Sequence, residues 1–137
     1  MGRCNKRDIC AVLLGICTAA ILWITILSRE VQSGVSFYPP FHTIGAFWRD
    51  IQRGGISGNL FGNILLFIPI GVLLSFITGW KGRTVIIAAG FSLVIETTQF
   101  ITSRGCFDLD DVLLNTVGCF IGYGLLQIAS HYSQKKT

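Results

Sequence analysis

Polar side chains that could do chemistry form two stripes of helical spacing. Steps of four, three and four residues relate Ser92, Glu96, Gln99 and Ser103, and steps of three, four, three and four relate Asp108, Asp111, Asn115, Gly118 and Gly122. Residues three or four apart lie on one face of a helix. The carboxylates of Glu96 and Asp111 are candidate catalytic acids or bases. The candidate ligand-binding residues are Asn59, Asn63, Gln99, Arg104, Asp108 and Asn115.

Arg104 stands close in sequence to Asp108, Asp110 and Asp111, and two interpretations stay open. A lone arginine beside carboxylates is most often a structural ion pair, because a buried acid without a partner becomes protonated. Alternatively, Arg104 and the amides bind an anionic group while one carboxylate handles a proton or a divalent ion. The acid spacing matches no calcium-binding loop, so we expect no metal.

The sequence lacks the motifs of the common enzyme classes. It holds no GxSxG, HExxH, phosphate-binding P-loop or GxGxxG pattern, so no standard hydrolase, metalloprotease or nucleotide enzyme is indicated and no cofactor is expected. The five cysteines include no CxxC pair, and Cys106 is the one candidate for an exposed thiol. His42 and His131 lie too far apart in the predicted topology to form a joint site, and we interpret both as surface residues.

Composition places these residues in a membrane protein. Of 137 residues, 51% are hydrophobic and only 13% are charged, and the mean hydropathy is +0.62. A soluble domain carries about 25% charged residues. The basic residues flank apolar runs and do not follow one face, so the net charge of +4 indicates membrane topology and not a nucleic-acid partner.

Four apolar runs predict an all-α integral membrane protein with four transmembrane helices in a single domain of residues 1–137. The runs are 9–27, 58–77, 85–101 and 112–129, each about long enough to cross a bilayer. A cleaved signal peptide is the alternative for the first run, with Val31 and Ser33 resembling a cleavage site. The apolar core is long for that role, which favours a retained anchor.

Lys and Arg are distributed unevenly between the predicted loops. Seven lie at the amino terminus, between the second and third spans, and in the tail, whereas four lie in the other two loops: Arg29, Arg49, Arg53 and Arg104. Cytoplasmic segments carry the excess of positive charge. We therefore expect a multi-pass protein of the cell membrane with both termini in the cytoplasm, and with residues 28–57 and 102–110 facing outward.

The first outward loop carries an amphipathic pattern after Pro39 and Pro40. Ile44, Phe47, Trp48 and Ile51 share one helical face, opposite Arg49, Asp50, Gln52 and Arg53. A short helix lying on the outer membrane surface shows this pattern. It is most simply an interfacial anchor in contact with membrane lipids, and the alternative is a lid or lipid-binding element.

The polar residues of the spans converge at one depth. Glu96 and Asn115 lie a turn or so inside the outward ends of their spans, and Asn59 and Asn63 begin the second span. Such residues usually face the bundle interior. Gly118 and Gly122 form a GxxxG pair that lets another helix approach, and Pro69 should bend the second span below this layer. The sequence thus predicts a polar pocket just under the outer face.

The ordered motifs resemble one known family. Asn63 is followed by Phe67, Pro69 and Gly71, then by Glu96 with Gln99, and then by RGCFDLDDVLLNTVG, which holds Arg104, Asp108, Asp111, Asn115 and Gly118. This order is similar to that of the VanZ-like family, over residues 59–122. The resemblance implies a small bacterial membrane protein acting at the outer leaflet and related to teicoplanin resistance, because founding members accompany glycopeptide-resistance genes. It implies no particular reaction.

Three functional hypotheses remain. The first is an envelope protein that lowers susceptibility to lipophilic glycopeptides by binding or altering an outer-leaflet component, so that the ligand is lipid-linked or the glycopeptide itself. The second is a membrane-embedded enzyme in which Glu96 or Asp111 acts as a base and Arg104 stabilises a phosphate or carboxylate. The third is a non-catalytic subunit that docks another membrane protein through its GxxxG face, and no particular oligomeric state is predicted.

Overall fold

A computed structural model describes residues 5–31, 37–54, 58–79 and 81–135, with the backbone only at residues 58, 59 and 81. Its helices are α1 (Lys6–Leu22), continued by the π-helical turn η1 (Trp23–Leu27), then α2 (His42–Gln52), α3 (Gly58–Thr78), α4 (Lys81–Ile101) and α5 (Leu109–Gln134). The described residues contain no strand, only an isolated bridge between Phe37 and Phe107.

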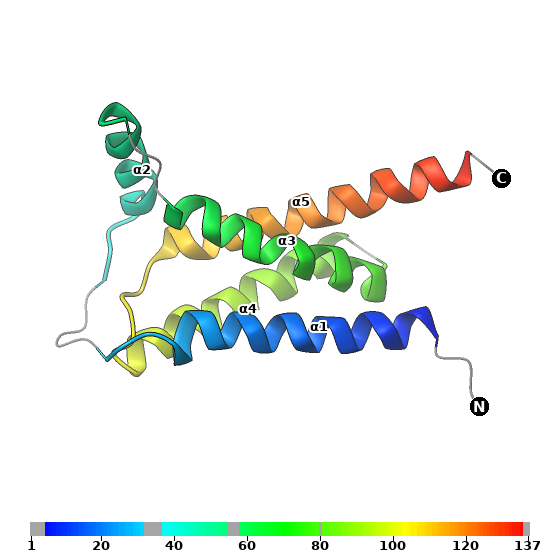
Figure 1. Ribbon diagram of the computed structural model, residues 1–137, viewed down its shortest axis with the longest axis horizontal. Coiled ribbons are helices and arrows are strands. Elements are labelled where there is room, and N and C mark those ends of the chain that lie inside the picture. The colour runs from blue at the N-terminus through cyan, green and yellow to red at the C-terminus, as the bar shows by residue number, and fades with distance from the viewer. Residues whose placement is uncertain (1–4, 32–36, 55–57, 80, 136–137) are drawn as a thin grey trace.

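Four of the helices are long and apolar enough to cross a membrane, as predicted: Lys6–Leu27, Leu60–Thr78, Gly82–Ile101 and Leu109–Gln134. They run roughly alongside one another, and both chain ends lie at the same end of the bundle (Figure 1). We call this the terminal end, and the opposite end the α2 end. The protein is therefore an all-α, multi-pass membrane protein.

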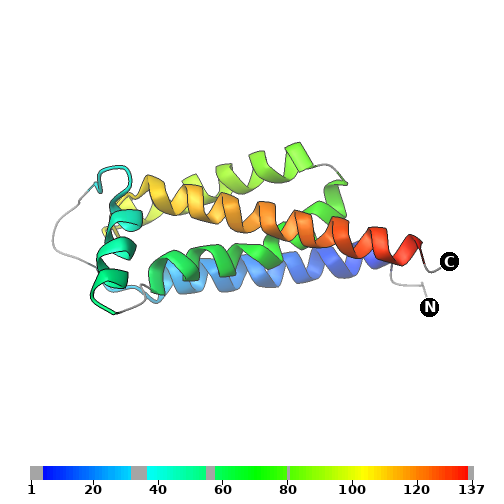
Figure 2. The same cartoon turned by 90° about the horizontal axis from the view of Figure 1, so that it is seen from above.

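α2 lies across the α2 end, at a steep angle to the long helices (Figures 1 and 2). In this orientation α2 is placed as a helix that lies along a membrane surface would be. Its apolar positions are largely exposed in the isolated chain, at 41% for Ile44, 62% for Trp48 and 44% for Ile51. This arrangement matches the interfacial amphipathic helix that the sequence predicts.

α3 and α5 form the tightest contact of the bundle, and glycines make it. A Cβ built on Gly118 would lie 2.3 Å from the carbonyl oxygen of Ile64, and one on Gly122 would lie 2.2 Å from that of Ile68. Gly71 approaches α5 in the same way, because a Cβ built on it would lie 2.2 Å from the carbonyl oxygen of Cys119. The GxxxG pair therefore packs within this chain, which allows the two backbones to touch.

α3 stays helical through Pro69, and it changes direction along its length (Figure 2). Proline removes one backbone hydrogen bond and crowds the preceding turn, which explains a bend at this position. The part of α3 before Pro69 then carries Asn63 toward the α2 end. The core beside it is formed by residues that include Ile21, Phe67, Ile70, Ala88, Ile95 and Cys119.

Candidate functional site: a charged cavity at the α2 end

The site begins at the amino terminus of α5. Asp108 is its N-cap, with extended backbone angles (φ −125°, ψ 113°), and its side chain accepts a hydrogen bond of 2.8 Å from the backbone N–H of Asp110. An aspartate at this position satisfies one of the free amides of the first turn. The helix therefore begins at Leu109, three residues before the start that the apolar run predicts, and places Asp110 and Asp111 in its first turn.

The start of α2 is capped from the far end of the chain. Its N-cap residue, Phe41, has a left-handed backbone (φ 64°) and no capping side chain of its own. Asp110 instead accepts hydrogen bonds from the backbone N–H groups of Phe41 (2.7 Å) and Thr43 (2.9 Å). In return the Thr43 hydroxyl donates to Asp108 at 2.7 Å. The first turns of α2 and α5 thus hold each other in place.

Glu96 supports this junction from α4. Its carboxylate accepts a 3.0 Å hydrogen bond from the backbone N–H of Asp108, and its side chain is only 2% exposed. A buried charge of this kind needs such a partner. Glu96 does not line the cavity described next, so the structure gives it a contact with the loop before α5 and no direct access to a ligand.

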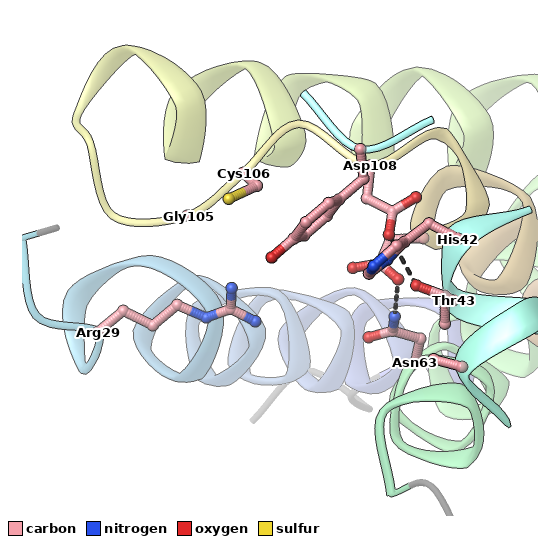
Figure 3. Close-up of a pocket in the computed structure, with 10 residues that line it drawn as sticks. Arg29, His42, Thr43, Asn63, Gly105, Cys106 and Asp108 are labelled. Atoms are coloured by element: carbon pink, nitrogen blue, oxygen red, sulfur yellow. Dashed lines mark hydrogen bonds between the residues drawn. The ribbon is translucent and has the colours of Figure 1, made fainter. Parts of the chain in front are cut away.

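A cavity of about 230 Å³ opens beside the junction (Figure 3). Three borders are the segment just after η1, the segment before α2 and the loop before α5. The others are the first turns of α2 and α5 and the part of α3 before Pro69. Its lining residues are Arg29, Tyr38, His42, Thr43, Ala46, Asn63, Gly105, Cys106, Asp108 and Asp111. Most of them are polar, and both signs of charge are present.

Asp111 and Asn63 form the acidic side of this cavity. The amide N–H₂ of Asn63 donates to one carboxylate oxygen of Asp111 in a short hydrogen bond. Within the described residues the other carboxylate oxygen of Asp111 and the carbonyl oxygen of Asn63 have no hydrogen-bond partner. Asp111 is half-buried, so this pair keeps acceptors that a ligand can reach.

Arg29 provides the positive charge on the other side. Its guanidinium points into the cavity from beyond the end of η1, opposite His42 and Thr43 (Figure 3). It is close enough to interact electrostatically with both Glu96 and Asp111. A Cβ on Gly105 would lie 3.1 Å from one of its nitrogens. The absence of a side chain at Gly105 therefore leaves room for the guanidinium.

Two aromatic residues at the start of α2, Tyr38 just before it and His42 as its first residue, contribute two more polar groups. Tyr38 lines the cavity beside Cys106, and the proximity of that side chain is the main reason why the pKa of Tyr38 is raised. The hydroxyl therefore stays protonated and able to donate. His42 stacks on the ring of Tyr38, with ring centroids 4.0 Å apart and planes 4° apart. Its Nδ1 is buried and has no hydrogen-bond partner among the described residues.

Arg104 and Gln99 act on the first span and not on the carboxylates. One guanidinium nitrogen of Arg104 donates to the carbonyl oxygens of Leu27 (3.1 Å) and Arg29 (3.0 Å), with a longer contact to Ile26. Gln99 donates to the carbonyl oxygen of Thr25 at 3.0 Å. These are carbonyl groups at the end of a helix, which need donors. The two residues thus fix the segment that carries Arg29.

The remaining predicted site residues lie apart from the cavity. Asn115 donates to the hydroxyl of Ser92 at 2.7 Å, buried between α4 and α5, and its carbonyl oxygen has no partner among the described residues. The side chain of Asn59 lies outside the described residues. In the part of the chain that the structure describes, no group of three or more His, Cys, Asp and Glu side chains could hold a metal ion.

Comparison with known proteins places the chain in a family. The model of the VanZ/LLP1 family matches residues 11–130, which include most of each of the four spans and all residues that line the charged cavity. This chain belongs to the VanZ/LLP1 family. A relative, Protein VanZ of Enterococcus faecium, is 28% identical over 141 residues, an alignment that covers 99% of this chain and 83% of the relative. No solved structure matches the chain.

Membership in the VanZ/LLP1 family confirms the resemblance that the motifs indicated, and it makes the chain a membrane protein related to teicoplanin resistance. The motif residues Asn63, Asp108 and Asp111 come together in the cavity. Sequence reasoning missed Arg29, Tyr38 and the role of Asp110, and it placed His42 on the surface. The one signal for Arg29 was its position directly after the first apolar run.

Proposed function

We propose that this protein lowers the susceptibility of a bacterium to teicoplanin-type glycopeptides by binding a component of the outer membrane leaflet in the charged cavity. The observation that carries the proposal is the position of the cavity. A polar pocket with both signs of charge opens beside α2, at the end where this helix presents Trp48 and other apolar side chains. A ligand there has its polar group in the cavity and its apolar part in the membrane.

The outward orientation of the α2 end is part of this proposal. Both termini lie together at the opposite end (Figure 1), and the basic groups Arg3, Lys6, Arg7, Lys135 and Lys136 belong to those termini. Positive charge favours the cytoplasmic side. With the termini in the cytoplasm, the cavity faces the compartment in which glycopeptides act.

The size of the cavity supports a small polar group as ligand. Sites that enclose drug-sized molecules have volumes of about 300–1,000 Å³, whereas this cavity has about 230 Å³. A glycopeptide antibiotic is far larger than a typical drug. The proposal therefore assigns the cavity to a membrane component and not to the antibiotic.

The contacts of the other candidates favour binding over catalysis or partner docking. Glu96 is buried against Asp108 and does not reach the cavity, which weighs against a catalytic carboxylate pair. The GxxxG face of Gly118 and Gly122 is covered by α3, which weighs against docking through that face. A single accessible carboxylate, Asp111, opposite one arginine suits recognition of a polar group.

Susceptibility measurements in a teicoplanin-sensitive Gram-positive host test the proposal. The host expresses the wild type, Asp111→Asn or Arg29→Gln, with membrane levels determined for each. Asp50→Asn and Arg49→Gln serve as controls, because they remove the same charges on α2 outside the cavity lining. We expect a teicoplanin-selective rise in the inhibitory concentration with the wild type and both controls, and loss of that rise with either cavity variant.

Vancomycin, which lacks the acyl chain of teicoplanin, is measured in parallel. An equal rise for both drugs would contradict a function at the lipid surface. A rise that persists undiminished in Asp111→Asn and Arg29→Gln at wild-type expression would exclude the cavity as its cause.

A further inference from the structure

The two sides of the cavity carry opposite charges, and this separation limits which chemical class of ligand fits. Arg29 is the cation on the side of η1, and the hydroxyl of Tyr38 is a hydrogen-bond donor of the same cavity. An arginine matches the geometry of a phosphate, to which it can donate two parallel hydrogen bonds. This side therefore suits a phosphate oxygen pair.

The side opposite Arg29 offers acceptors. One oxygen of Asp111 and the carbonyl oxygen of Asn63 have no partner among the described residues, while both oxygens of Asp108 are already used by Asp110 and Thr43. Acceptor groups with a negative charge suit a group that donates hydrogen bonds and is itself positive. An ammonium group fits this description, because it has three donors and no acceptor.

The buried nitrogen of His42 is an independent sign that the cavity is built for a ligand. Buried polar atoms nearly always have a hydrogen-bond partner, yet Nδ1 of His42 has none among the described residues although the residue lines the cavity. In Figure 3 the imidazole lies near Thr43 and Asp108, opposite Arg29. A hydrogen-bond donor of a bound molecule on that side would satisfy it.

We propose that the cavity binds the zwitterionic headgroup of a membrane lipid, with the phosphodiester at Arg29 and Tyr38 and a primary ammonium at Asp111, Asn63 and His42. This inference rests on the proposed function and names the ligand class of the same cavity. The acidic side also explains selection: Asp108 and Asp111 line the cavity opposite Arg29, so a headgroup with a net negative charge is repelled.

The surroundings of the cavity favour a lipid over a free phosphate ester. Phe37 and Phe41 flank the segment that holds Tyr38, and each is 67% exposed in the isolated chain. Exposed aromatic side chains at the ends of membrane spans lie at headgroup level. A phosphodiester held at Arg29 can therefore leave its acyl chains in the membrane beside these rings.

Calorimetric titration of the purified full chain in detergent tests the inference. The probes are dihexanoyl phosphatidylethanolamine, phosphatidylcholine and phosphatidylglycerol with the same chains, and glycerophosphoethanolamine, which has no chains. We expect the ethanolamine lipid to bind at least about tenfold more tightly than either other lipid, which corresponds to about 1.4 kcal/mol. The choline headgroup has no N–H donor, and the glycerol headgroup has no positive charge. Weaker binding of glycerophosphoethanolamine would identify the lipid as the source, and equal binding would assign the cavity to the free ester.

Two variants locate the two halves of the headgroup. Asp111→Asn should abolish the preference for ethanolamine over glycerol. It should weaken the ethanolamine lipid, because the ammonium contact is lost, and tighten the glycerol lipid, because part of the repulsion of a net negative headgroup is lost. Arg29→Gln should weaken all the lipids. The controls Asp50→Asn and Arg49→Gln should bind like the wild type.

The lipid preference of the wild type is decisive even if a variant fails to fold. Equal affinity of the wild type for the three lipids, or preference for phosphatidylglycerol, would overturn the zwitterionic assignment. Equal weakening of the ethanolamine and glycerol lipids in Asp111→Asn would overturn the placement of the ammonium. Because these measurements use purified protein, they are separate from the susceptibility test. Selective binding without teicoplanin resistance would contradict the proposed function only, and resistance that needs Asp111 without lipid selectivity would contradict the ligand only.

Discussion

Two groups of polar side chains lie beside each other at the α2 end and differ in what their hydrogen bonds do. The cap cluster consists of Thr43, Glu96, Asp108 and Asp110, and the open group consists of Arg29, Asn63 and Asp111. In the cap cluster both oxygens of Asp108 and both oxygens of Asp110 accept hydrogen bonds from within the chain. In the open group Asp111 accepts only one, from Asn63.

This difference separates structural acids from ligand-binding acids. A carboxylate whose oxygens are saturated by backbone N–H groups has no acceptor left for a ligand, whatever its place in a motif. A carboxylate beside a cavity that has one oxygen without a partner can still accept a hydrogen bond from a ligand. Loss of a cap residue should therefore act mainly on stability, and loss of an open-group residue mainly on binding.

The largest effect on stability is expected from Asp110→Ala. The substitution leaves the backbone N–H groups of Phe41 and Thr43 without their acceptor at a position that is 1% exposed. Each unsatisfied buried donor costs about 1–3 kcal/mol, so we expect a loss of roughly 3 kcal/mol or more. Thermal unfolding in detergent measures it, with Asp50→Ala on α2 as the control. A melting temperature close to that of the wild type would contradict the joint capping of α2 and α5.

Arg104→Gln should have the next largest effect, and it connects the two groups. The guanidinium of Arg104 holds carbonyl oxygens at the end of the first span, including that of Arg29. Its loss should cost about 1–2 kcal/mol and also weaken teicoplanin resistance, because Arg29 is no longer held in place. Arg104→Lys should restore part of the stability and part of the resistance, since an ammonium still donates hydrogen bonds. Full resistance in Arg104→Gln at normal expression would show that Arg29 does not depend on this contact.

Thr43→Val removes a single hydrogen bond from the cap cluster and should cost less than either. The valine has nearly the same shape, so the change isolates the 2.7 Å hydrogen bond to Asp108. The typical net value of one such bond is about 1 kcal/mol, and somewhat more for a charged acceptor. Denaturation of the purified variant provides the measurement, and Thr116→Val on the same helix as Asp108 is a suitable control, because its hydroxyl bonds only its own helix. Equal losses of stability for Thr43→Val and Thr116→Val would mean that the hydrogen bond between α2 and Asp108 adds nothing to the stability of the fold.

The arrangement of the helices could be predicted from the sequence because it depends on patterns within each helix. The length of the apolar runs predicted the four spans, and the helical spacing of Ile44, Trp48 and their polar neighbours predicted α2. The spacing of Gly118 and Gly122 gave a close helix contact, which the structure assigns to α3. The stripe of Ser92, Glu96 and Gln99 is buried as its spacing required.

The partners of the arginines could not be predicted in the same way. Arg104 and Arg29 both follow a span, and the spacing from Arg104 to Asp108 and Asp111 left open a structural ion pair or a shared anion site. In the structure the π-helical turn η1 and the loop before α5 meet at this end. The guanidinium of Arg104 therefore donates to the carbonyl oxygens of Ile26 and Leu27 and not to the carboxylates. The capping of α2 by Asp110 has no signal in the sequence either, because it joins positions 69 residues apart through the left-handed backbone at Phe41.

The smallest effect on stability is expected for the open group, and there the comparison is sharpest. Asp111→Asn keeps an acceptor for Asn63, and Arg29 is an exposed residue, so Asp111→Asn and Arg29→Gln should each change the free energy of unfolding by no more than about 0.5 kcal/mol. Both should nevertheless lose the teicoplanin phenotype, whereas Asp110→Ala, although less stable, should keep it wherever its expression is normal, because Asp110 does not line the cavity. Melting temperatures and inhibitory concentrations measured on the same set of variants therefore vary independently if the cap cluster and the open group have the separate roles described. A single correlation of resistance with stability across all variants would mean that the spare acceptors of Asp111 have no function of their own.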